Sequence, residues 1–224
     1  MKKRSILVVI SCLLIGAAGC KQSNEKFISE GEIEYTATVI DQNNSMASMA
    51  PTKMIVAFKS NKSCAEMTAG MGLFKAAFIS DPEKKIFIQE VKILNKKFIL
   101  IEGEEEIKKE NDEFLVKLVP SKETKVIAGY VCKKVTVVPE DKTIQPFDVY
   151  YTDEVNIEDP NFTNPYHDIK GVLMEYQLKK FGLEMKFVAK SVKNVSVDDN
   201  CFQIPSDYKK VTHKEMKMIF DDLQ

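Results

Sequence analysis

The feature that most constrains the fold is a period-two alternation of apolar and polar side chains. It is clearest in residues 32–39, 172–179 and 183–190, where apolar residues alternate with charged or polar ones. Successive side chains of a strand point to opposite faces of a sheet, so this pattern predicts strands with one buried and one wet face. Antiparallel sheets commonly have that arrangement, and the chain is therefore expected to be mainly β, in the α+β class.

Further strands are predicted from short runs rich in β-branched and aromatic residues. Asp81-Pro82 is a turn signal between two of these runs, and Phe181-Gly182 predicts a hairpin between the strands on either side of it. The runs are residues 54–59, 73–80, 85–91, 97–101, 114–119, 130–138 and 147–152.

Helical signals are few. Thr212 and Glu215 match a capping box, and the apolar residues from Met216 to Leu223 follow at helical spacing, which predicts a C-terminal helix. Ser63–Met71 is a candidate for a second, short helix, and Glu104–Lys109 is expected to be one helical turn or a loop. Residues 156–168 contain two prolines and several Asn and Asp, which predicts a long irregular loop of the kind that is often functional.

The N-terminus has the features of an export signal. Met1–Arg4 is basic, Ser5–Gly16 is apolar, and three small residues precede Cys20. The arrangement resembles the bacterial lipoprotein signal, although Ala17 stands where that family most often has Leu. The resemblance implies a signal peptide over residues 1–19 and acylation of Cys20, for example with palmitate, to anchor the chain to a membrane. The alternative is ordinary secretion with a chance cysteine near the cleavage site.

The polar residues that follow Cys20 predict a tether over residues 20–30, which leaves residues 31–224 as a single domain. Lys21 is not the Asp that often retains lipoproteins in the inner membrane. By that analogy the expected location is the cell envelope, at the outer membrane. The analogy does not distinguish the periplasmic face of that membrane from its surface face. Beyond the signal, no second apolar run predicts a transmembrane helix.

The composition argues against a nucleic acid partner and does not decide whether the cysteines form a disulfide. Residues 20–224 carry 29 Lys+Arg and 33 Asp+Glu, well mixed along the chain, so we expect no nucleic acid partner. Besides Cys20 the domain has Cys64, Cys132 and Cys201. These residues predict either one disulfide with one free thiol, in any of three pairings, or three buried thiols. No Cys or His spacing indicates zinc or redox chemistry, so no metal or cofactor is expected.

Methionines suggest an apolar ligand site. Methionine is flexible and polarizable, which suits a lid or mouth that grips lipid or an apolar peptide. Ordinary packing is the alternative, and a copper(I) site made by Cys64, Met67 and Met71 is a weaker one. The candidate lining residues are Met46, Met49, Met54, Met67 and Met71.

The remaining candidate groups have simpler interpretations. His167 and Asp168 could serve a general base, but no nucleophile motif accompanies them, and His213 is expected to be solvated within the capping box. The Glu104–Glu106 run lacks the spacing of a calcium loop. Four aromatics could line a pocket or stack on sugars, although strand aromatics usually belong to the core. They are Phe147, Tyr150, Tyr151 and Tyr166.

Several sequence segments together resemble those of an uncharacterised family of envelope lipoproteins (a domain of unknown function, 4412 type). They are Gly31–Tyr35, the Met-rich stretch to Met54, Ile79–Lys85, Ile127–Lys134, Tyr150–Thr152, Ile169–Glu175 and Phe202–Tyr208. That family is similar in architecture to the LolA, LolB and RseB group of lipoprotein carriers and regulators. The resemblance implies a curved antiparallel half-barrel with short helical segments over its concave face. In the carriers this concavity holds acyl chains, and the family has no assigned catalytic residues.

Two functions from different classes follow. The first is a non-enzymatic envelope protein that binds acyl chains, a lipoprotein segment or another apolar ligand. The second is a structural or sensory module that docks another envelope protein through its sheet edge or the 156–168 loop. An enzyme is a third and weaker hypothesis. A carrier needs an apolar cavity of roughly several hundred Å³ under the sheet, whereas a filled core favours docking. The sequence leaves the oligomeric state open.

Overall fold

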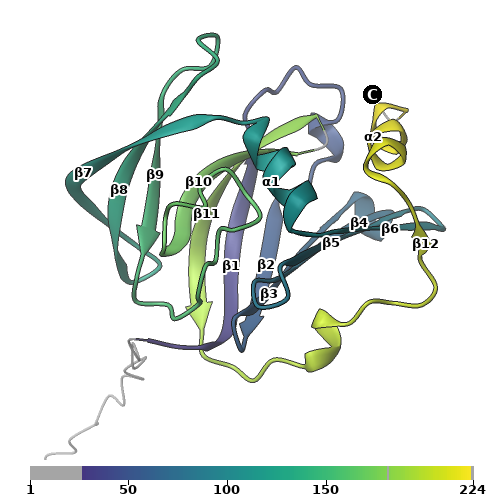
Figure 1. Ribbon diagram of the computed structural model, residues 1–224, viewed down its shortest axis with the longest axis horizontal. Coiled ribbons are helices and arrows are strands. Elements are labelled where there is room, and N and C mark those ends of the chain that lie inside the picture. The colour runs from purple at the N-terminus through teal and green to yellow at the C-terminus, as the bar shows by residue number, and fades with distance from the viewer. Residues whose placement is uncertain (1–26, 181, 223–224) are drawn as a thin grey trace, which may run out of the picture.

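The chain forms one large antiparallel sheet, and the predicted mainly β fold is confirmed (Figure 1). The computed structural model describes residues 27–180 and 182–222. The strands are β1 (Glu30–Val39), β2 (Lys53–Lys59), β3 (Lys62–Ala69), β4 (Phe74–Asp81), β5 (Ile86–Ile93), β6 (Lys96–Glu102), β7 (Val116–Ile127), β8 (Tyr130–Pro139), β9 (Phe147–Thr152), β10 (Val172–Lys180), β11 (Leu183–Lys193) and β12 (Lys209–Lys210). The helices are α1 (Glu104–Asp112) and α2 (His213–Asp221), with short 3-10 turns η1 (Ala47–Met49), η2 (Gly70–Gly72) and η3 (Asp199–Phe202).

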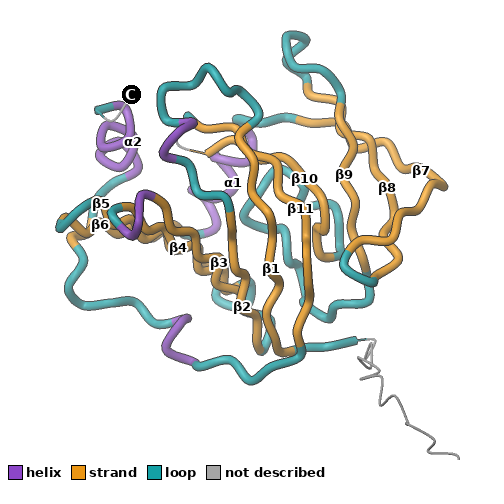
Figure 2. Tube along the Cα trace, turned by 180° about the vertical axis from the view of Figure 1, so that it is seen from behind, coloured by secondary structure: helices purple, strands orange, loops and turns teal. Residues whose placement is uncertain are grey.

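The strands follow the order β12-β6-β5-β4-β3-β2-β1-β11-β10-β9-β8-β7, and every neighbouring pair is antiparallel except β12 with β6. The sheet does not close, since β12 and β7 are its two edges. Figure 2 shows that it is strongly curved, with β7–β9 at one end and β4–β6 at the other. A curved sheet with one apolar face needs elements on its concave side to bury that face.

The predicted alternation matches the burial of the strands. In β1 the side chains of Ile33, Tyr35 and Ala37 are buried, whereas Thr36 and Thr38 are exposed. The hairpin predicted around Phe181-Gly182 is also present, because β10 and β11 pair antiparallel up to Lys180 and Leu183. The turn after Asp81 forms as expected: its carboxylate accepts the Lys84 N–H at 3.2 Å.

The short helix predicted over Ser63–Met71 is wrong, because this segment is strand β3 followed by η2. Its apolar residues also fit an alternation, and helix and strand are hard to distinguish over so short a run. The missed signal is Ser60-Asn61, where both residues have positive φ and link β2 directly to β3. Two-residue hairpin turns of this kind match the twist of the strands that they join.

Two other segments differ from their expected lengths. The Glu104–Lys109 run is not a loop but the first part of helix α1, which extends to Asp112 and buries Ile107. Strand β7 was expected over residues 114–119 and instead continues to Ile127 beyond an irregularity at Pro120. The continuation from Lys122 to Lys125 is polar and exposed, which is common in an edge strand, whereas Ile127 at its end is buried.

Helix α2 confirms the predicted C-terminal helix and its capping box. The Thr212 hydroxyl accepts the Glu215 N–H at 3.3 Å, and the Glu215 carboxylate accepts the Thr212 N–H at 2.7 Å. Met216 and Phe220 are buried against β5 and β6, in a cluster with Val91 and Leu100. The helix therefore covers the end of the sheet that lies beside β12 (Figure 1).

The signal peptide over residues 1–19, Cys20 and most of the tether over residues 20–30 lie outside the described residues. Folded structure is already present at Ile28, which is buried and forms a parallel bridge with Val155. Among the described residues, no helix has the length and apolar character needed to cross a membrane.

Candidate functional site: an apolar cavity under the sheet

The concave side of the sheet encloses a cavity of about 410 Å³. Its wall is formed by residues of the central strands, together with side chains from α1, α2 and the loop of residues 156–168. Most of the lining side chains are apolar. Those from the sheet include Ile33, Tyr35, Met54, Val56, Ala65, Met67, Phe74, Ala76, Phe78, Phe87, Tyr176, Leu178, Met185 and Phe187.

The strand register explains why these residues meet. One row of direct cross-strand neighbours consists of Ile33, Val56, Ala65 and Phe78, and the next consists of Tyr35, Met54, Met67 and Ala76. Because side chains alternate between faces, each row points to one side of the sheet. Each row contains one small side chain, Ala65 in the first and Ala76 in the second, and both line the cavity.

The opposite side of the cavity is covered by α1 and the 156–168 loop, which are joined to each other. The Asn111 side-chain amide of α1 donates a hydrogen bond to the carbonyl of Phe162 at 3.0 Å. Within the loop, the buried Asn161 amide donates to the carbonyls of Ile169 at 2.6 Å and Gly171 at 2.9 Å. These bonds fasten the loop to α1 and to the segment that leads into β10.

Three charged residues line the cavity within the described part of the chain: Glu110, Lys179 and Lys180. The Lys180 ammonium forms an ion pair with the Glu110 carboxylate of α1. It also lies over the Phe87 ring, 5.3 Å from the ring centroid. Lys180 ends β10 while Phe87 belongs to β5, and five strands separate these two in the sheet. The lysine side chain therefore crosses the concave side from one wall to the other.

The five predicted methionines are not all at the cavity. Met54 and Met67 are direct cross-strand partners and line it, as does Met46 at the start of η1. Met71 is fully exposed in η2, and the side chain of Met49 is not among those described. Met185 of β11 also lines the cavity, and the sequence pattern that identified it as a strand residue did not mark it as part of a site.

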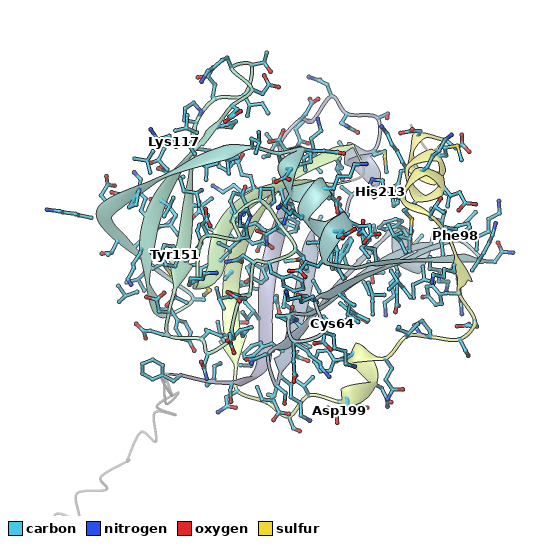
Figure 3. The ribbon with its side chains drawn as sticks, in the orientation of Figure 1. Cys64, Phe98, Lys117, Tyr151, Asp199 and His213 are labelled. Carbon is cyan, nitrogen blue, oxygen red and sulfur yellow. The ribbon has the colours of Figure 1, made fainter. Side chains whose placement is uncertain are left out.

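The three cysteines of the described residues are free thiols in two environments. Cys64 and Cys201 share a cluster on the outer face of β3–β6, beside η3, which carries Asp199, labelled with Cys64 in Figure 3. Cys132 belongs to the core cluster around β1. Burial raises the pKa of Cys64 to about 12 and the pKa values of Cys132 and Cys201 to about 11. High pKa values keep the thiols protonated and poorly nucleophilic at neutral pH.

The hypothetical copper(I) ligands are not brought together. Cys64 lies in the cluster on the outer face of β3, whereas Met67 lines the cavity on the concave face, and Met71 is exposed in η2. Side chains at positions of opposite parity in one strand point away from each other. A site that uses all three residues is therefore excluded by the register of β3.

Each of the two histidines lies beside a carboxylate, in different parts of the fold. His167 Nε2 and Asp168 Oδ1 are 3.9 Å apart, and both side chains are largely exposed on the loop. His213 was expected to be solvated and is about half exposed, but its Nδ1 lies 3.3 Å from Oε1 of Glu102. Glu102 and Gln89 are buried and hydrogen-bonded to each other, forming a polar group that the sequence pattern did not identify.

The aromatic and acidic candidates have structural roles. Tyr166 is buried and donates its hydroxyl hydrogen to the carbonyl of Gln177, while Phe147 and Tyr151 pack against the same cluster. Tyr150 packs against the main core. Glu104, Glu105 and Glu106 form the first turn of α1, where acidic side chains interact favourably with the helix dipole.

No protein-family model matches this chain, and neither does any curated protein. Among solved structures, the crystal structure of MucB is similar over 80% of this chain, with 10% sequence identity and a TM-score of 0.30. The match spans 57% of the MucB chain. A likeness at this TM-score carries no argument about fold or function, so membership of the envelope lipoprotein family stays a prediction.

Proposed function

We propose that this protein is a non-enzymatic binding protein that holds an acyl chain, or another elongated apolar ligand, in the cavity under its sheet. The observation that carries the proposal is the cavity itself, with a volume of about 410 Å³ and mostly apolar side chains around it. Ligand pockets have volumes of about 300–1,000 Å³ and are lined mainly by apolar groups with a few polar ones. A filled core would instead have favoured a docking module.

The distribution of apolar and polar side chains around the cavity suits an amphiphilic ligand. The sheet supplies the apolar wall, while the polar lining side chains include Glu110, Asn111 and Asn161 from the cover and Lys180 from the end of β10. Burying one methylene group contributes about 0.8 kcal/mol, so a chain of ten or more carbons would gain several kcal/mol from this wall. Methionines at Met54 and Met67 can adjust to ligands of different shape.

The cell-envelope location is part of the same proposal. A chain anchored through acylated Cys20 would be held where membrane lipids and lipoproteins are available, at the outer membrane by the analogy with lipoprotein signals. Metabolic labelling with an alkyne palmitate should modify the native chain and not the Cys20→Ala variant. Label in both, or in neither, would contradict the anchor without affecting the cavity.

A cavity-filling substitution tests the binding proposal. Ala65 lies in the middle of the cavity wall, and Ala65→Phe adds an aromatic ring where there is space for it. The matched control is Val131→Phe on β8, where the side chain faces solvent. Both substitutions are made in the Cys20→Ala chain, so that no covalent acyl group competes with the probe.

Fluorescence titration with N-phenyl-1-naphthylamine reports apolar binding. We expect saturable binding to the parent and to Val131→Phe, and a loss of at least about tenfold in affinity for Ala65→Phe, whose ring fills the ligand volume. Equal binding by all three proteins would place the probe elsewhere. An absence of binding to the parent would reject the carrier function in favour of docking.

A further inference from the structure

The cavity contains a cation in a position that an apolar ligand alone does not require. The Lys180 side chain leaves β10, pairs with Glu110 of the covering helix and reaches the Phe87 ring of β5 on the opposite wall. Its side chain is 21% exposed and that of Glu110 is 19% exposed, so the pair is largely removed from water. Charge interactions are stronger in such surroundings than at a solvated surface.

From this geometry, and resting on the proposed function, we propose that the ligand is an amphiphile with an anionic head, such as a fatty acid, whose head is bound by the Lys180 ammonium. The tail would lie along the sheet wall formed by Val56, Ala65 and Met67. An ammonium has three donors on a rotatable group, so it can contact a ligand carboxylate while it remains beside Glu110.

The placement of Lys180 supports an anionic rather than a cationic head. Of the charged residues at the cavity in the part of the chain that the structure describes, Lys179 is exposed and its side chain points to the other face of β10, so Lys180 is the cation that faces the ligand. A cationic head would have to displace Lys180 from Glu110. An anionic head adds a second acceptor to Lys180, and charge-assisted hydrogen bonds of this kind are stronger than neutral ones.

The arrangement also predicts opposite effects for the two members of the ion pair. Lys180→Met retains the apolar stem and removes the charge, so it should weaken binding of an acid more than binding of a neutral analogue. Glu110→Gln removes a like charge beside the bound carboxylate and should strengthen binding of the acid. A pair that only fastens α1 to the sheet predicts instead that both substitutions affect every ligand in the same direction.

The test compares dodecanoate with dodecanol, which differ in the head and share the tail, as competitors of N-phenyl-1-naphthylamine at pH 8. In the Cys20→Ala chain we expect dodecanoate to bind about tenfold more tightly than dodecanol, in keeping with one charge-assisted contact. Lys180→Met should abolish this preference, because its loss of affinity for dodecanoate should exceed its loss for dodecanol by about tenfold. The matched control is Lys190→Met, since Lys190 is exposed and pairs with Glu34 on β1.

Each remaining outcome decides the matter. Equal affinities for the acid and the alcohol in the parent would overturn the anionic head while leaving the cavity function intact. If Lys180→Met loses affinity equally for both ligands, and Glu110→Gln gains none for the acid, the ion pair is purely structural. That result would also overturn the anionic head. Failure of both ligands to displace a bound probe, or of the probe to bind, would reject the proposed acyl-chain function itself.

Discussion

At the scale of single residues, burial determines which carboxylates affect the stability of the fold. Asp81 and Glu175 are buried but lie beside two lysines each, so their charges are compensated. Glu90 differs, because its Oε1 is buried and has no hydrogen-bond partner within residues 27–180 and 182–222. Burial is the main cause that raises its pKa from 4.5 to about 7, and the nearby Glu66 and Asp207 add to the effect.

This residue predicts a pH dependence of stability. Because the pKa of Glu90 is higher in the folded chain than in the unfolded one, the folded state keeps its proton while the unfolded state releases it. The free energy of unfolding should therefore fall as pH rises from about 4.5 to about 7 and then stay level. Glu90→Gln should stabilise the protein at pH 8 by about 1–2 kcal/mol after allowance for solvent screening, and by little at pH 4.

Urea denaturation at the two pH values measures this difference. Glu140→Gln, which changes an exposed residue after β8, is the control and should have the same small effect at both. A gain from Glu90→Gln that is equal at pH 4 and pH 8 would contradict the raised pKa.

At the scale of elements, the two helices are short and depend on what fixes their ends. Isolated helices of nine residues are marginal in water, so α1 and α2 form because they pack on the sheet and are capped. In α1 the Glu106 carboxylate accepts the Gly103 N–H at 3.1 Å, and in α2 Thr212 and Glu215 bind each other's N–H groups. The caps set where each helix begins, and the buried residues set which face contacts the sheet.

Loss of the Thr212 cap should therefore destabilise α2. Thr212→Ala removes the hydroxyl that accepts the Glu215 N–H, and the free energy of unfolding should drop by about 1 kcal/mol. Thr212→Ser keeps the hydroxyl and should have a much smaller effect. The measurement is urea denaturation of the three proteins, and similar values for Ala and Ser would show that the hydroxyl does not cap the helix.

At the scale of the whole molecule, the proposed ligand would stabilise the curved sheet. The cavity is bounded by strands from the middle of the sheet and by both covering segments, so a bound ligand would contact most of the fold. A ligand that binds only the folded state stabilises it by about 2.7 kcal/mol when present at one hundred times its dissociation constant.

Saturating dodecanol should therefore raise the Tm of the Cys20→Ala chain by several degrees, as expected for such a gain in a chain of about 200 residues. The same concentration should leave the Tm of the Ala65→Phe variant unchanged, because its cavity is filled. An equal shift in both would indicate a non-specific effect of the alcohol on the folded surface.

The sequence by itself determined most of the strands, the C-terminal helix and the presence of an apolar face, because alternation and capping are local patterns that each segment carries alone. It did not distinguish β3 from a helix, since a short apolar run fits both until its pairing with β2 and β4 is known. Only the tertiary structure decided that Met54 and Met67 adjoin, that Cys64 faces away from them, and that Lys180 meets Phe87 across five strands. These relations depend on register and curvature, which arise from contacts between residues distant in the chain.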